Sequence, residues 1–296
     1  MSVSPAAPMI AYSPNAAMLW SGLVNQAYDT FSNHPGNANP SPPVLPPGWN
    51  FVANLQVNLH LLGTYYFIGW ILSGSNGQTA FVFLGTEDLE WLYDLDAQFT
   101  QHPLGGCVEA GMYAMYQSLS SIVPGNTNRT SIANAMTSTL TGSGLVTVAG
   151  HSLGGAFTTF VAAEIATSNM QIYSIASPRV GDATFAAAFN QKVANNFRIY
   201  NIQDYVPTLP PSELGFVHVQ TALPQPELDS WQYPIYHGFN PIRAAECYHS
   251  HAGYFYMLSV LAGRSPNAKS LLGTCYAPTQ PVSSVQLTRS ATPPGK

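Results

Sequence analysis

Apolar residues in this chain follow first a helical pattern and then two strand-like runs. From Asn15 to Phe31 they recur at helical spacing, and Asn15 is a suitable N-cap. The β-branched and aromatic runs Thr64 to Leu72 and Thr79 to Leu84 are separated by the turn sequence SGSNGQ. The pattern therefore predicts an N-terminal amphipathic helix followed by a β-hairpin.

Helices and short buried strands alternate over the next hundred residues. The predicted helices are Gly111 to Ile122 and Gly155 to Thr167, and the predicted strands are Leu145 to Ala149, Ile172 to Ala176 and Phe197 to Ile202, with a helix between the last two. This alternation predicts an α/β fold with a mostly parallel sheet covered by helices on both faces. We see no internal repeat and no second core, so we expect one domain over residues 1–296, with an irregular tail over residues 265–296.

Composition narrows the possible functions. Charged residues make up 8% of the 296 residues, hydrophobic residues 46%, and the net charge is −5. So apolar a chain can bury a large core, and its nine lysines and arginines form no basic cluster that could bind nucleic acid. No apolar run approaches the roughly 18 residues of a membrane span. No signal peptide is visible, because the N-terminus lacks a basic region and an unbroken apolar region, and the compartment stays open.

The three cysteines, Cys107, Cys247 and Cys275, do not form a dense disulfide framework, because their number is odd. One bridge, for instance between Cys247 and Cys275, and three free thiols are both compatible with the sequence. The chain has no CxxC pair and no HExxH motif, so the sequence predicts no metal site.

The segment LVTVAGHSLGGAFTTFVAAEIA carries the strongest chemical signal. A buried strand leads into Gly-His-Ser-Leu-Gly, and an alanine-rich helix follows. In a strand–turn–helix context, GxSxG is a nucleophile elbow, and the flanking glycines let the turn tighten around Ser152. The N-terminus of the helix favours negative charge beside that serine. Ser152 is therefore the expected nucleophile.

An acid and a base should follow the nucleophile in that order. Asp204 lies just past the predicted strand Phe197 to Ile202, at the edge of the sheet where such sites form, and nearby prolines fix its loop. Later histidines include His249, which precedes a helix capped by Ser250, and His251, which opens that helix. We expect His249 to be the base and keep His251 as the alternative.

Five segments in order resemble motifs of the class 3 lipases, fungal and bacterial α/β-hydrolases that share a fold with feruloyl esterases. They are FVFLGTEDLEWLYDLDAQF, VEAGMYAMYQSL, VAGHSLGGAF, SIASPRVGDATFAAAFN and RIYNIQDYVPTLPP. The resemblance covers residues 65–258 and implies an α/β-hydrolase fold with a lid helix. It leaves the base open, because family members show either HSxxxY, which matches His249 to Tyr254, or HxxYF, which matches His251 to Phe255.

The resemblance also implies roles around the nucleophile. Thr86 matches the first oxyanion donor, and Leu153 supplies the second through its backbone N–H. Leu84 and Glu109 replace the family's arginine and histidine, so the packing near them must differ.

Residues 88–105 match the lid, with an ordinary amphipathic surface helix as the alternative. Trp91, Leu92 and His151 are the residues expected at the lid and the substrate.

Together these features predict a serine ester hydrolase, most consistent with a lipase that hydrolyses triacylglycerol through an acyl-enzyme and without a metal or organic cofactor. The expected partner is a lipid or another carboxylic ester, met at an oil–water interface. The alternatives are a feruloyl or aryl esterase, a phospholipase A1, and a lipid-binding protein that has lost the chemistry.

Overall fold

A mixed β-sheet forms the centre of the computed structural model, which describes residues 9–58, 63–86, 97–140, 142–165, 167, 169–219 and 226–277. Within these residues the sheet has nine strands in the order β11-β10-β9-β8-β3-β2-β1-β6-β7. One half is parallel and consists of β3 (Thr79–Phe83), β8 (Val146–His151), β9 (Met170–Ile175), β10 (Asn196–Asn201) and β11 (Glu227–Leu228). The carboxyl ends of these strands meet at one edge, where α/β sheets build their sites.

The other half of the sheet is antiparallel. It consists of β2 (Tyr66–Gly74), β1 (Trp49–Val57), β6 (Ser120–Ile122) and β7 (Thr130–Ser131). The one-turn helix η1 (Ser75–Gly77) connects β2 to β3, with Asn76 and Gly77 at positive φ. A separate two-stranded sheet pairs β4 (Phe99–Gln101) with β5 (Cys107–Glu109).

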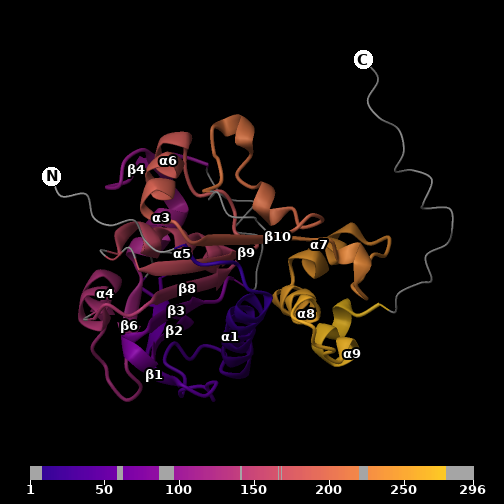
Figure 1. Cartoon of the computed structure of the whole chain (residues 1–296), viewed down its shortest axis with the longest axis horizontal. Coiled ribbons are helices and arrows are strands. Elements are labelled where there is room, and N and C mark those ends of the chain that lie inside the picture. Colours follow the sequence, from indigo (N-terminus) through magenta and orange to yellow (C-terminus); the bar gives the residue numbers. More distant parts are fainter. Residues whose placement is uncertain are drawn as a thin grey trace.

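Helices cover both faces of the sheet (Figure 1). On one face lie α3 (Ala110–Gln117), α5 (Leu153–Glu164) and α6 (Ala183–Lys192), and α1 (Pro14–Asn33) lies on the other. Helix α4 (Ile132–Thr139) packs on β6 and β7. The C-terminal part contains α7 (Pro241–His249), α8 (His251–Leu261) and α9 (Ala268–Leu272), and α8 packs against both α1 and α9. Short 3₁₀ turns complete the described part: η2 (Val206–Thr208), η3 (Ser212–Leu214), η4 (Ser230–Gln232) and η5 (Gly273–Cys275).

The α/β class and the hairpin predicted from the sequence are confirmed, and several boundaries need correction. Helix α1 is capped by Ser13, which accepts a hydrogen bond from Ala16, and not by Asn15. The helix predicted over residues 111–122 ends at Gln117, because residues 120–122 leave it to form β6 along the edge of β1. Part of the tail expected to be irregular forms the short helix α9, and residues 278–296 lie outside the described residues.

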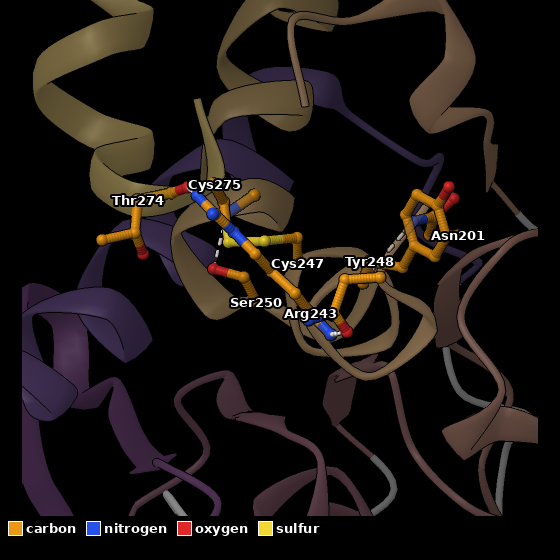
Figure 2. The surroundings of a disulfide bond; sticks show 9 residues. Asn201, Arg243, Cys247, Tyr248, Ser250, Thr274 and Cys275 are labelled. Carbon is orange, nitrogen blue, oxygen red and sulfur yellow. Dashed lines mark hydrogen bonds between the residues drawn. A yellow bond between two sulfur atoms is a disulfide. The ribbon is translucent and has the colours of Figure 1, made fainter. Parts of the chain in front are cut away.

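A disulfide between Cys247 and Cys275 joins α7 to the segment that follows α9 (Figure 2). The same segment pairs with residues 234–236, since Tyr236 N donates to Cys275 O at 2.8 Å and Ala277 N donates to Pro234 O at 2.9 Å. Arg243 of α7 also donates to the carbonyl of Thr274. Covalent and hydrogen-bond contacts thus hold α7 against the C-terminal segment.

Loss of this disulfide is expected to destabilise the fold. The double variant Cys247→Ser, Cys275→Ser should lower the free energy of unfolding by about 2–4 kcal/mol, because the bridge closes a loop of 28 residues in the unfolded chain. Urea unfolding measures the difference, and Cys107→Ser, which removes the free thiol, is the control. Equal stabilities of the double variant and the control would contradict the expectation.

Two histidines outside the C-terminal part are largely shielded from water and lie near cationic side chains. His102 packs against the rings of Tyr113 and Phe185, and burial lowers its pKa to about 4. The charge of Lys192 also lowers this pKa. The carboxylate of Glu164 lies 3.9 Å away and accepts from two tyrosine hydroxyls. Burial lowers the pKa of His218 to about 3, and its Nε2 lies 2.7 Å from the carbonyl oxygen of Pro207.

These pKa shifts predict lower stability in acid. Both histidines are neutral when folded, whereas in the unfolded chain they bind a proton below about pH 6.5. Stability should therefore fall as the pH drops from about 6.5 toward 4, with a slope of up to about 1.4 kcal/mol per pH unit for each such histidine. Urea unfolding between pH 7.5 and pH 4.5 tests this expectation. His218→Gln keeps a donor for Pro207 and should reduce the slope; an unchanged slope in that variant would count against the assignment.

Candidate active site

Ser152 stands on a sharp turn between β8 and α5, as the nucleophile elbow requires. Its φ of 58° and ψ of −125° are unusual for a residue with a side chain. Its backbone N–H donates to Ile175 O at 3.0 Å, which ties the turn to β9. A Cβ at Gly150 would lie 2.2 Å from Gly154 O, so only glycine allows the two arms of the turn to approach so closely.

His249 lies within hydrogen-bond distance of both Ser152 and Asp204. His249 Nε2 is 2.8 Å from Ser152 Oγ, and His249 Nδ1 is 2.7 Å from Asp204 Oδ2. All three residues are buried. The structure thus brings together the three residues that the sequence predicts as nucleophile, acid and base.

Asp204 follows the end of β10, and three donors hold its carboxylate. Val206 N donates to Oδ1 at 3.0 Å, and the hydroxyl of Tyr254 donates to Oδ2 at 2.8 Å, beside His249. Burial raises the pKa of Tyr254 well above its ordinary value, so its hydroxyl stays protonated and available as a donor. Two donors besides the histidine thus orient the carboxylate.

His249 is the last residue of α7, and the residues around it fix the end of that helix (Figure 2). Asn201, at the end of β10, donates from Nδ2 to Tyr248 O at 3.0 Å. Ser250 caps α8 by accepting from Gly253 N, and the disulfide holds Cys247. The imidazole thus projects from a junction between two helices that is held at Cys247, Tyr248 and Ser250.

The alternative base, His251, has other partners. Its Nδ1 is 2.8 Å from Asn25 Oδ1, and its ring stacks on Tyr28 with a centroid distance of 3.9 Å and an interplanar angle of 6°. Burial lowers the pKa of His251 to about 4. The other two late histidines are also engaged elsewhere: His218 with Pro207, and His237 with Tyr248 and Trp231.

His151, which the sequence places at the substrate, contacts helix α1. It is 2% exposed, and its Nδ1 lies 2.9 Å from the hydroxyl of Tyr28. His151 is the last residue of β8, directly before the turn. Because side chains alternate along a strand, it points to the face of the sheet on which α1 lies. His151 therefore lies behind the nucleophile.

The expected oxyanion donors lie on two segments beside Ser152. Leu153 is the first residue of α5, so its N–H has no acceptor within the helix. Thr86 is half-buried and follows β3. Between Thr86 and the strand stands Gly85, where a Cβ would lie 2.6 Å from Ser152 Cβ and 2.8 Å from His151 O.

Gly85 was not identified from the sequence as part of the site. A signal was present, because a glycine directly before an expected oxyanion donor indicates a close backbone approach. Its Cβ-free backbone lets the segment that carries Thr86 pass directly against the elbow.

Of residues 88–105, which the sequence predicts as a lid, only residues 97–105 are described. Trp91 and Leu92 lie outside the described residues. Residues 99–101 form strand β4, so the amphipathic helix expected over residues 88–105 does not extend through this part. Phe99, 40% exposed, stacks on Phe216 with a centroid distance of 4.1 Å.

The two departures from the family motifs have local explanations. Leu84 is buried in the hydrophobic core, where no arginine could keep its charge solvated. Glu109 is also buried and caps α3, because its Oε2 accepts from Met112 N at 2.6 Å. Both replacements therefore serve local structure on either side of the site.

The described residues contain no group of three or more histidine, cysteine or acidic side chains that could hold a metal ion. Among the same residues, no helix is long and apolar enough to cross a membrane.

Comparison with known proteins shows that part of the chain is similar in sequence to lipases. Residues 80–214 match the sequence profile of the family described as Lipase (class 3). Over 94 residues the chain is 38% identical to a secreted mono- and diacylglycerol lipase of Malassezia globosa, which covers 30% of this chain and 29% of that protein. Over 75 residues it is 41% identical to secreted mono- and diacylglycerol lipase A of Penicillium camembertii, covering 24% of each. The chain thus aligns with less than a third of the length of these relatives.

Solved structures extend the likeness over most of the fold. The lipase of Rhizopus microsporus var. chinensis has a TM-score of 0.53 at 21% identity and covers 74% of this chain and 76% of its own. Lipase II of Rhizopus niveus has a TM-score of 0.53 at 21% identity, covering 71% and 81%. These similarities show the α/β-hydrolase fold. Together, the profile match and the fungal relatives show that this part of the chain is similar to class 3 lipases.

Proposed function

We propose that the chain is a serine ester hydrolase that acts on acylglycerol lipids. The observation that carries the proposal is the hydrogen-bonded series from Ser152 Oγ through His249 to Asp204, at the N-terminus of α5. A serine hydroxyl is a weak nucleophile until an adjacent base takes its proton. In this arrangement, the base and the group that orients the base are both already in place.

The first half of the reaction forms an acyl-enzyme. Ser152 Oγ attacks the ester carbonyl while His249 Nε2 accepts its proton, which requires the neutral imidazole to carry its proton on Nδ1. The Nδ1–H donates to Asp204, 2.7 Å away, whose charge stabilises the imidazolium that forms. His249 then returns the proton to the leaving alcohol oxygen.

The carbonyl oxygen becomes negatively charged in the transition state. The N–H of Leu153 and the Thr86 segment are the donors proposed to bind it, and the N-terminus of α5 adds a favourable dipole. In the second half, water attacks the acyl-enzyme with the same base, and the carboxylic acid leaves.

The relatives support the substrate class. The aligned fungal proteins are mono- and diacylglycerol lipases, and charged residues make up only 8% of this chain, as suits an apolar substrate. A panel of emulsified tri-, di- and monoacylglycerol, phosphatidylcholine and a feruloyl ester tests this choice. Highest kcat/KM on an acylglycerol is expected; highest on the feruloyl ester or the phospholipid would replace the proposed substrate with that one.

Substitution of the nucleophile and the base tests the assigned roles. Ser152→Ala and His249→Gln should each lower kcat by about 10⁴-fold or more, because the residues act as a unit. His251→Gln should lower it far less, since His251 does not contact Ser152. A fluorophosphonate probe gives a second measurement and should label the wild type at Ser152. An unlabelled, folded wild type would favour a lipid-binding protein without the chemistry, and near-normal activity of His249→Gln would overturn the choice of base.

Gly85→Ala tests the close approach of the oxyanion segment. The added Cβ would meet the backbone of His151 and the side chain of Ser152, and should displace Thr86 and lower kcat by about 10²-fold or more. Gly142→Ala is the matched control, because the nearest atom to its added Cβ is 3.9 Å away. Thermal unfolding of both variants separates misplacement from misfolding: a folded Gly85→Ala enzyme with wild-type kcat would contradict the expectation.

A further inference from the structure

Helix α1 brings polar side chains to the rear of the active site. Tyr28 is 4% exposed, and its hydroxyl oxygen accepts the N–H of Gly85 at 2.8 Å. The same hydroxyl lies 2.9 Å from His151 Nδ1. One side chain thus bonds both the segment of the expected oxyanion donor and the residue directly before the nucleophile.

Two hydrogen bonds meet at the oxygen of Tyr28. It accepts the N–H of Gly85 and also bonds Nδ1 of His151, where the tautomer of the imidazole sets which group donates. Burial and the nearby His249 and His251 lower the pKa of His151 well below its ordinary value, which keeps the ring neutral.

His151 connects Tyr28 to the proposed base. Its ring lies against the ring of His249, with a centroid distance of 4.7 Å, and against that of Tyr254 at 5.4 Å. Among the described residues, the buried Nε2 of His151 has no hydrogen-bond partner. The backbone of His249 lies close enough to raise the pKa of His151 against the larger effects that lower it. Contact is therefore continuous from Gly85 through Tyr28 and His151 to His249.

The other neighbours of Tyr28 hold its ring in place. His251 stacks on one face in a nearly parallel arrangement, and Asn25, one turn earlier on α1, bonds His251 Nδ1 at 2.8 Å. Helix α8, which begins with His251, packs against α1 (Figure 1). The hydroxyl of Tyr28 therefore has a fixed position relative to both Gly85 and His151.

We propose that Tyr28 is a positioning residue for ester hydrolysis, which holds the Gly85–Thr86 oxyanion segment in register with the nucleophile and supports the base through His151. The role rests on the proposed function and deepens it. Tyr28 acts through its neighbours Gly85 and His151. Without its hydroxyl, the N–H of Gly85 and Nδ1 of His151 would lose a shared partner, and the oxyanion segment would be free to shift.

The test is Tyr28→Phe, which keeps the ring stacked on His251 and removes only the hydroxyl. With a soluble ester, kcat should fall by about 10- to 100-fold while KM changes by less than about threefold, because the oxyanion donors act in the transition state. The rate of fluorophosphonate labelling at Ser152 should fall in parallel. Tyr113→Phe is the control: it also removes a buried hydroxyl that hydrogen-bonds, in this case to Glu164, and its kcat should stay at the wild-type value.

The outcomes separate this role from the proposed function. If the wild type neither hydrolyses esters nor labels, the proposed function fails. If the wild type is active and Tyr28→Phe has the same kcat and labelling rate, the positioning role fails alone. A lower melting temperature with unchanged kcat well below melting would show that the hydroxyl serves only stability, and would also overturn the proposal.

Discussion

The hydrogen bond between His249 and Asp204 joins two parts of the chain that the sheet does not connect. Asp204 stands on the loop after β10, whereas His249 ends a helix that lies beyond the sheet. No strand pairing sets the distance between them, so other contacts must do so. Asn201 bonding Tyr248, Tyr254 bonding Asp204 and the Cys247–Cys275 bridge all act within a few residues of this one pair. These contacts of the C-terminal part together fix the position of the His249 imidazole relative to Asp204.

The nucleophile imposes a different constraint, which is steric. A serine at φ 58° is strained and needs surrounding contacts to keep that conformation. Here the backbone of neighbouring segments packs closely around the turn. Gly150 allows contact with Gly154, Gly154 allows contact with Leu84, and Gly85 allows contact with the turn itself. Each of these glycines removes a side chain at a point where backbone meets backbone. The close backbone contacts at these glycines are the same contacts that hold Ser152 in its strained conformation.

Local pattern was sufficient to predict the parts of the site that depend on neighbouring residues. The elbow is one continuous strand–turn–helix, and Asp204 follows a recognisable strand, so both could be placed from the sequence. The orientation of His249 and His251 depends on partners distant in sequence, such as Asn25 for His251, and the histidine motifs alone could not decide between them. The contact of His151 with Tyr28, 123 residues away, could likewise not be predicted from the local pattern. The strand β1 was not predicted, because WNFVANLQV mixes polar and apolar residues without a clear strand pattern. Its pairing with β2 on one side and β6 on the other places it in the sheet.

Burial of polar groups explains why an N-terminal helix belongs to the active site. Ser152, His151, His249 and Asp204 are all buried, and each polar atom taken from water must find a partner or cost free energy. The sheet can supply few such partners at its edge, because its own N–H and C=O groups pair with each other. Side chains from α1 and α8 supply them instead: Tyr28 for His151 and Tyr254 for Asp204. The two helices pack against each other, so the side chains that hydrogen-bond Gly85, His151 and Asp204 lie on two elements in mutual contact.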